Sequence, residues 1–195
     1  GTEYNTPRNV VKLDIFQIMH GEFPIAYERH IAPNVTLQAA LGLTMSDYWY
    51  HFWRDNVNDD YKRGKVDESN GGWSLRAGVR FYPGREDNAP DGVYLSAQLM
   101  HKRYDWKQRF DVSSGGNVVL PQHRYLTDLQ FLLGYQHLAY SRMVIDVYGG
   151  VGLRKLDLKR QEYEYNSSGS YVLMDANKND TRPCFVMGLQ IGFGW

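Results

Sequence analysis

Eight charged residues lie in segments whose apolar residues alternate at every second position, so they are the first candidates for chemistry in this chain. Four are basic and four are acidic: Lys12, Asp14, Glu28, Arg76, Arg80, Asp128, Asp146 and Arg154. Alternating positions face opposite sides of a β-strand, so these side chains are predicted to share the face opposite the apolar residues. Charges that are enclosed together must pair, because an unpaired buried charge is costly. We therefore expect an electroneutral lumen network in which Arg76 and Arg154 bracket Asp128, and Arg80 pairs with Glu28 or Asp146.

Histidines and serines, the residue types of an esterase-like site, are also present. His137 and Ser141 lie close in sequence but on a predicted short turn, whereas Ser113 and Ser114 lie in a predicted loop near His123. Neither set has a third group that orients a base toward a nucleophile. We expect no catalytic residues and no enzyme activity, and a lipid-modifying barrel enzyme is the least favoured alternative.

Metal and cofactor sites are not expected either. The six histidines do not show the spacings of a zinc site. The segment from Asp175 to Asp180 resembles the first half of a calcium loop, but Asp180 stands where that loop needs glycine and Val186 where it needs the closing glutamate.

The C-terminal stretch indicates which element positions the charges. Every second residue from Phe185 to Trp195 is large and apolar, and the residues between them include Gly188, Gly192 and Gly194. This alternation is typical of a β-strand with two different environments. A row of glycines packs poorly and suits a crowded interior better than a water-facing surface.

The same alternation recurs along the chain and predicts eight strands. Their bounds are Val10–Met19, Glu22–Ile31, Val35–Trp53, Trp73–Tyr82, Val93–Trp106, Arg124–His137, Met143–Lys155 and Arg182–Trp195. Short turns alternate with long polar loops, which are Arg54–Gly72, Lys107–His123 and Leu156–Thr181. We predict an all-β fold: an eight-stranded antiparallel up-and-down transmembrane β-barrel, with short periplasmic turns and long outer loops, as a single domain over residues 1–195.

The facing of the strands separates a membrane barrel from a soluble one. In the predicted strand Trp73–Tyr82, Arg76 and Arg80 share a face with Gly78, and Leu75 and Val79 lie on the other face. A soluble barrel of the lipocalin kind turns its apolar face inward, where charges would not fit. Glycines beside long charged side chains favour a narrow polar lumen inside a lipid-facing wall.

Aromatic residues gather at both predicted rims, as expected where rings meet lipid headgroups. The outer belt is predicted to hold Trp49, Trp53, Trp73, Trp106 and Tyr125, and the periplasmic belt Tyr82, Tyr135, Tyr140 and Trp195.

Composition limits the function classes. Lys plus Arg and Asp plus Glu both number 22, so the net charge is zero, which argues against nucleic-acid binding. The mean hydropathy is −0.54, and no stretch reaches the roughly 20 apolar residues of a membrane helix. Cys184 is the only cysteine, so no internal disulfide can form. The chain begins with Gly1, and we expect that a signal peptide has been removed.

Two segments carry a resemblance to a known family: Ile25–Leu37, with its Tyr-Glu-Arg stretch before a short turn, and the terminal strand Phe185–Trp195. With the eight-strand pattern, the chain resembles the small outer-membrane β-barrels of OmpA and OmpX architecture, including uncharacterised barrels of Bacteroidetes-type outer membranes. The resemblance implies the outer membrane of a Gram-negative bacterium and recognition of the terminal strand by the barrel-assembly machinery.

We expect a structural or adhesive outer-membrane protein with a sealed, charge-paired lumen. Its expected partners are outer-membrane lipid, the barrel-assembly machinery and an extracellular ligand on the outer loops, and we expect a monomer. The alternatives are a small porin or hydrophobic-substrate channel, and a soluble lipocalin-like ligand-binding barrel.

Overall fold

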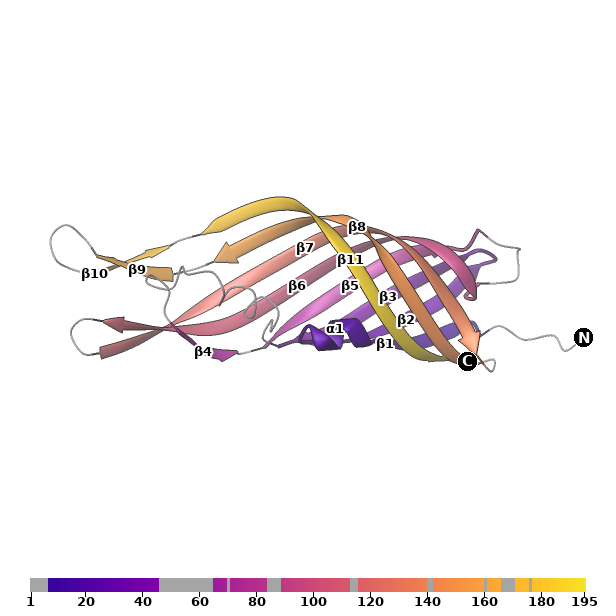
Figure 1. Ribbon diagram of the computed structural model, residues 1–195, viewed down its shortest axis with the longest axis horizontal. Coiled ribbons are helices and arrows are strands. Elements are labelled where there is room, and N and C mark those ends of the chain that lie inside the picture. Colours follow the sequence, from indigo (N-terminus) through magenta and orange to yellow (C-terminus); the bar gives the residue numbers. More distant parts are fainter. Residues whose placement is uncertain are drawn as a thin grey trace, which may run out of the picture.

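Eight antiparallel strands close in a ring in the computed structural model, which describes residues 7–45, 65–69, 71–83, 89–112, 116–139, 142–159, 161–165, 171–175 and 177–195. In ring order these strands are β1 (Asn9–Asp14), β2 (Glu22–Ala32), β3 (Val35–Thr44), β5 (Gly72–Phe81), β6 (Gly92–Val112), β7 (Gly116–Ala139), β8 (Met143–Lys159) and β11 (Lys178–Gly194). Pairing of β1 with β11 completes the circle (Figure 1). The prediction of an all-β, up-and-down ring of eight strands is confirmed.

The first strand is shorter than predicted, because a helix replaces its second half. The strand β1 ends at Asp14, and α1 (Ile15–Met19) follows. The Asp14 Oδ1 atom accepts a hydrogen bond from the Gln17 backbone N–H at 3.1 Å, which is the geometry of a helix N-cap. Gly21, with φ of 79°, then turns the chain into β2. No helix in the described part of the chain is long and apolar enough to cross a membrane.

The helix leaves one strand edge without a ring partner. The register of β1 with β11 runs only from Val10 opposite Gly194 to Asp14 opposite Gln190. Within the described ranges, no strand pairs with this side of β11 between Lys178 and Leu189, and α1 lies against both β11 and β2.

The strands β6 and β7 extend well beyond their predicted ends. Their register continues without a shift from Gly92 opposite Gln136 to Val112 opposite Gly116. The predicted loop Lys107–His123 is therefore wrong, since nearly all of it is strand. Antiparallel pairing satisfies the backbone groups of polar residues in a long hairpin, so their polarity did not require a loop.

Three shorter strands lie outside the ring. The strand β4 (Lys65–Ser69) pairs with β6, and β9 (Gln161–Tyr165) pairs with β10 (Tyr171–Asp175) in a separate hairpin. The predicted loop Leu156–Thr181 thus contains this hairpin as well as the ends of β8 and β11. The hairpin and the long β6–β7 ribbon project from the same end of the ring (Figure 1). The predicted strand Val35–Trp53 ends at Thr44 as β3, and residues 46–64 lie outside the described residues.

Burial in the ring is inverted relative to a water-soluble protein. Lys12, Arg80 and Asp146 are at most 1% exposed, whereas Leu41 is 68% and Phe185 is 87% exposed. Along β2 and β5 and the first half of β8, buried positions alternate with more exposed ones, so the charged row faces inward and the apolar row faces outward.

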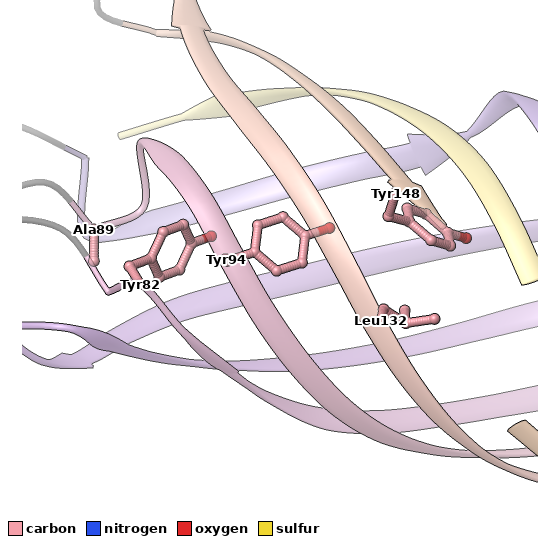
Figure 2. Close-up of a cluster of buried hydrophobic side chains, with 5 residues drawn as sticks. All are labelled: Tyr82, Ala89, Tyr94, Leu132 and Tyr148. Carbon is pink, nitrogen blue, oxygen red and sulfur yellow. The ribbon is translucent and has the colours of Figure 1, made fainter. Parts of the chain in front are cut away.

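Tyrosines fill much of the interior. Tyr82, Tyr94 and Tyr148 form the buried cluster with Ala89 and Leu132 (Figure 2). The Tyr94 ring lies over Gly134, its partner across β6 and β7, and the Tyr148 ring lies over Gly188, its partner across β8 and β11. These two glycines therefore make room for aromatic rings, in addition to the room for charges that the sequence suggested.

Candidate functional site

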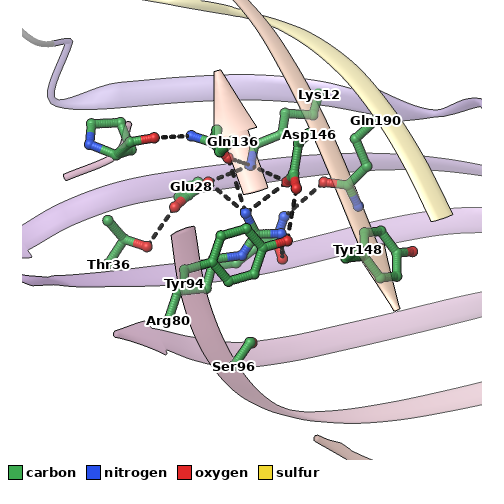
Figure 3. Close-up of polar contacts among 12 residues, drawn as sticks. Lys12, Glu28, Thr36, Arg80, Tyr94, Ser96, Gln136, Asp146, Tyr148 and Gln190 are labelled. Atoms are coloured by element: carbon green, nitrogen blue, oxygen red, sulfur yellow. Dashed lines mark hydrogen bonds and ion pairs between the residues drawn. The ribbon is translucent and has the colours of Figure 1, made fainter. Parts of the chain in front are cut away.

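Two cations and two carboxylates form the centre of the interior polar network (Figure 3). Arg80 Nη1 lies 2.7 Å from Asp146 Oδ2 and 3.3 Å from Glu28 Oε2. Lys12 Nζ lies 2.9 Å from Asp146 Oδ2 and also pairs with Glu28. All four side chains are at most 1% exposed, so water does not reach them. Their two positive and two negative charges neutralise one another. We call these four residues the central cluster.

Neutral side chains complete the hydrogen bonding of the two carboxylates. Tyr94 donates to Asp146 Oδ1 at 2.7 Å, Tyr82 donates to Glu28 Oε1 at 2.9 Å, and Thr36 donates to the same oxygen at 2.5 Å. The Arg80 guanidinium also lies 4.2 Å from the centroid of the Tyr94 ring. Such additional partners are what allow a buried ion pair to repay its desolvation cost.

Every strand of the ring contributes a side chain to this connected network. In ring order the contributors are Lys12, Glu28, Gln38, Arg80, Tyr94, Gln136, Asp146 and Gln190. Gln136 accepts from both Lys12 and Arg80, and Gln38 joins Arg80 to Gln190 at 2.9 and 3.2 Å. The hydrogen bonds therefore cross the interior from one wall to the other.

A second cluster lies next to the first and centres on Asp14. Its Oδ2 accepts from Tyr148 at 2.5 Å and from Gln190 at 3.2 Å, and it lies 3.6 Å from Arg76 Nη1. The predicted bracketing of Asp128 by Arg76 is therefore wrong. Arg76 comes from β5 and faces β1 and β8 across the ring, a relation that alternation along single strands does not encode.

Of the two arginines predicted to bracket Asp128, only Arg154 pairs with it, and Arg76 does not. Arg154 donates through Nε at 2.9 Å and through Nη2 at 2.7 Å, a bidentate arrangement. The two residues are direct neighbours across β7 and β8. Gln130 also donates to Asp128 at 3.0 Å.

Sequence reasoning missed three buried charged residues of the interior: Glu22, Lys102 and Arg124. Lys102 pairs with Glu22 and donates to Gln17 at 2.9 Å. The signal was present, since Glu22 stands in phase with Glu28 on β2, and Lys102 stands in phase with Tyr94 on β6.

The predicted aromatic belts divide into three groups. Trp73, Tyr135 and Trp195 are 43%, 52% and 56% exposed on the outer wall, and Tyr125 is half-buried there. Tyr82 is instead buried inside the ring, where it bonds Glu28, so its place in a belt is wrong. Trp106 lies on the inward-facing row of β6, two positions from buried Tyr104. Trp49, Trp53 and Tyr140 lie outside the described residues.

Three described histidines near the rims each contact a different residue and do not form one site. His123 contacts Asp105 at 2.6 Å, His101 contacts Thr127 at 2.8 Å, and His137 lies 3.8 Å from Asp91. Ser113, Ser114 and Ser141 lie outside the described residues. In the part of the chain that the structure describes, no group of three or more His, Cys, Asp or Glu side chains is placed to hold a metal ion.

Comparison with protein-family models, with curated proteins and with solved structures found no match for this chain. Within the described residues, the interior is a cross-linked network of buried charges that braces opposite walls, and an apolar exterior encloses it.

Proposed function

We propose that this protein is a β-barrel of the outer membrane of a Gram-negative bacterium, with a structural or adhesive role. The polar network seals and braces its interior, and the projecting hairpins carry any recognition of an extracellular ligand. The protein would act as a monomer and without catalysis.

The observation that carries this proposal is the inverted burial. Large apolar side chains such as Leu41, Leu133 and Leu153 are each at least 58% exposed, while the charges of the central cluster face inward. Moving one side chain of this size from water into an apolar environment is favourable by about 1.5–3 kcal/mol. A wall of such residues is stable in lipid, whereas monomeric soluble proteins rarely expose large contiguous apolar patches.

Two further features support an outer-membrane location. Pairing around the ring satisfies backbone groups as lipid requires, with α1 in place of a strand against β11 where β1 ends, and the final strand ends on exposed aromatic residues, Phe193 and Trp195. The latter resembles the terminal strand that the barrel-assembly machinery recognises, so that machinery is the proposed partner in folding.

The packed interior favours a barrel that is closed to ions and ligands over a channel or a ligand-binding barrel. The central cluster joins β1, β2, β5 and β8 by direct ion pairs across the ring. A channel or a lipocalin-like site would need space where these side chains meet.

A matched pair of substitutions tests the membrane proposal. Leu41→Arg places a charge on the outer wall of β3, and Leu173→Arg makes the same change on β10 at a residue that is also exposed. If Leu41 faces the bilayer centre, Leu41→Arg should destabilise the protein folded in phospholipid vesicles, lowering its free energy of unfolding by about 2–4 kcal/mol. Leu173→Arg should change it by less than about 0.5 kcal/mol, the usual size of a surface effect.

Folding into vesicles is titrated with urea, and the folded fraction at each urea concentration is read from the gel mobility of unheated samples. Equal stability of the two variants would contradict a lipid-facing wall. Recovery of the native protein in the soluble fraction of cells, rather than with the outer membrane, would contradict the proposed location.

A further inference from the structure

Basic and aromatic residues gather on the outer wall next to the apolar band, on the side from which the long hairpins project. The last apolar row there joins Leu99, Leu129 and Leu153 in register across β6, β7 and β8. The rows beyond it contain the following outward-facing residues, which we call the rim patch: Trp73, His101, Arg103, Tyr125, Lys155 and Lys159.

Contacts among these side chains make the rim patch a continuous surface. The Trp73 and His101 rings lie 5.3 Å apart, and the His101 and Tyr125 rings lie 6.2 Å apart and stacked. Arg103 and Lys159 approach the Tyr125 ring at 5.7 and 5.6 Å from its centroid. A row of amphipathic rings topped by cations is the arrangement expected at the level of lipid headgroups.

The charges of the rim patch are only partly neutralised. Arg103 donates to Asp105 at 2.9 Å, which raises the pKa of Arg103, and His123 contacts the same carboxylate. Lys155 and Lys159 are exposed and form no ion pair with any carboxylate of the described residues. Asp157 lies between them on β8 and is half-buried. Two ammonium groups are therefore available to an anion from outside.

We propose that the rim patch binds the phosphate of an anionic lipid headgroup in the outer leaflet, with Lys155 and Lys159 as the phosphate ligands. This inference rests on the proposed membrane location. A lysine ammonium is a common phosphate ligand, and the Tyr125 ring beside Lys159 offers a flat surface to the headgroup. The adjoining row of Leu99, Leu129 and Leu153 would contact the acyl chains, which free phosphate lacks.

The test compares two double variants that remove the same charge. Lys155→Gln with Lys159→Gln alters the rim patch, and Arg29→Gln with Arg142→Gln removes two exposed cations near the opposite end of the ring. Each protein is placed in micelles with equal amounts of phosphatidylglycerol and phosphatidylcholine, and native mass spectrometry counts the retained lipids. Each cation near an anionic surface contributes about fivefold to binding, so the rim variant should lose roughly tenfold or more of its phosphatidylglycerol preference.

The control variant should keep that preference, and an excess of inorganic phosphate should not displace the lipid. Three results would overturn the inference: no preference in the native protein, an equal loss in both variants, or displacement by inorganic phosphate alone. Folding into vesicles is measured for each protein in parallel. Failure to insert would contradict the proposed function, whereas insertion without lipid preference would contradict the rim patch alone.

Discussion

Arg80 lies at the centre of the interior because its guanidinium donates in several directions from one rigid plane. It reaches Glu28, Asp146 and Gln136 through Nη1 and Gln38 through Nη2. A lysine at this position would keep the charge but lose the planar fork and the stacking on a ring. The central cluster therefore depends on this residue type as well as on its charge.

Removing Arg80 should destabilise the protein, because the two buried carboxylates that it neutralises lose one of their cations. Arg80→Met leaves Glu28 and Asp146 with Lys12 as their only cation, and breaking a buried pair in this way costs about 3–5 kcal/mol. Arg142→Met is the control, since Arg142 is exposed at the rim and should change stability by less than about 0.5 kcal/mol. Urea unfolding in detergent micelles measures both. An Arg80→Met protein as stable as the native one would show that the network does not stabilise the ring.

Gly134 and Gly188 leave room for the rings of Tyr94 and Tyr148, which a larger residue would not. A Cβ atom at Gly134 would collide with the ring of Tyr94, whereas a Cβ atom at Gly149 would have its nearest neighbour at 3.8 Å. Gly134→Ala should therefore lower the free energy of unfolding by about 1–3 kcal/mol, the usual cost of overpacking, while Gly149→Ala should be close to neutral. The same unfolding assay compares them, and equal effects would mean that Tyr94 moves without cost.

Among the elements, the β9–β10 hairpin is joined to the ring by the side chain of Gln122. The Gln122 amide on β7 donates to the Gln161 carbonyl at 3.0 Å and accepts from the Gln161 N–H at 3.2 Å. It thus pairs with the backbone of β9 much as a neighbouring strand would. An isolated two-stranded hairpin is marginally stable in water, so this anchor should matter.

Gln122→Ala should release the hairpin without weakening the ring. Limited proteolysis is expected to cut within residues 161–175 several-fold faster, while the gel mobility of the unheated protein stays unchanged. Gln161→Ala is the matched control, because it keeps the backbone groups that Gln122 binds and removes only a 3.3 Å contact with Asp175. Equal cleavage of the two variants would contradict the role of Gln122.

At the scale of the whole molecule, the interior network predicts a ring that does not conduct. Side chains from all eight ring strands are joined across the interior, and their charges are fully buried. An eight-stranded barrel leaves an interior that side chains just fill.

Recordings in planar bilayers test this expectation. The native protein should show no large, stable conductance steps, whereas Arg80→Ala combined with Tyr94→Ala, which removes two bulky side chains, should raise the frequency of opening. The variant is first checked for folding by its gel mobility. Large, steady steps from the native protein would contradict a sealed interior and favour the channel alternative.

Alternation of residues along the chain determined the strand-rich class, the number of ring strands and the opposite character of the two faces. These properties are local, because side chains of a strand alternate in direction whatever the partner strand. Alternation alone therefore predicts the inward facing of Arg80 and Asp146 and the outward facing of Leu75 and Val79, and burial agrees.

Tertiary structure alone decided which charges pair and where the strands end. Arg76 meets Asp14 rather than Asp128 because partners across the ring depend on strand register and closure, which alternation within one strand does not specify. The segment after Asp14 became a helix through a capping contact, and polar hairpins stayed paired beyond the ring because pairing satisfies their backbone. Tyr82 continues the inward row of Arg76 and Arg80, and only the fold brings its hydroxyl to the buried Glu28 carboxylate, a partner from another strand and 54 positions earlier in the chain.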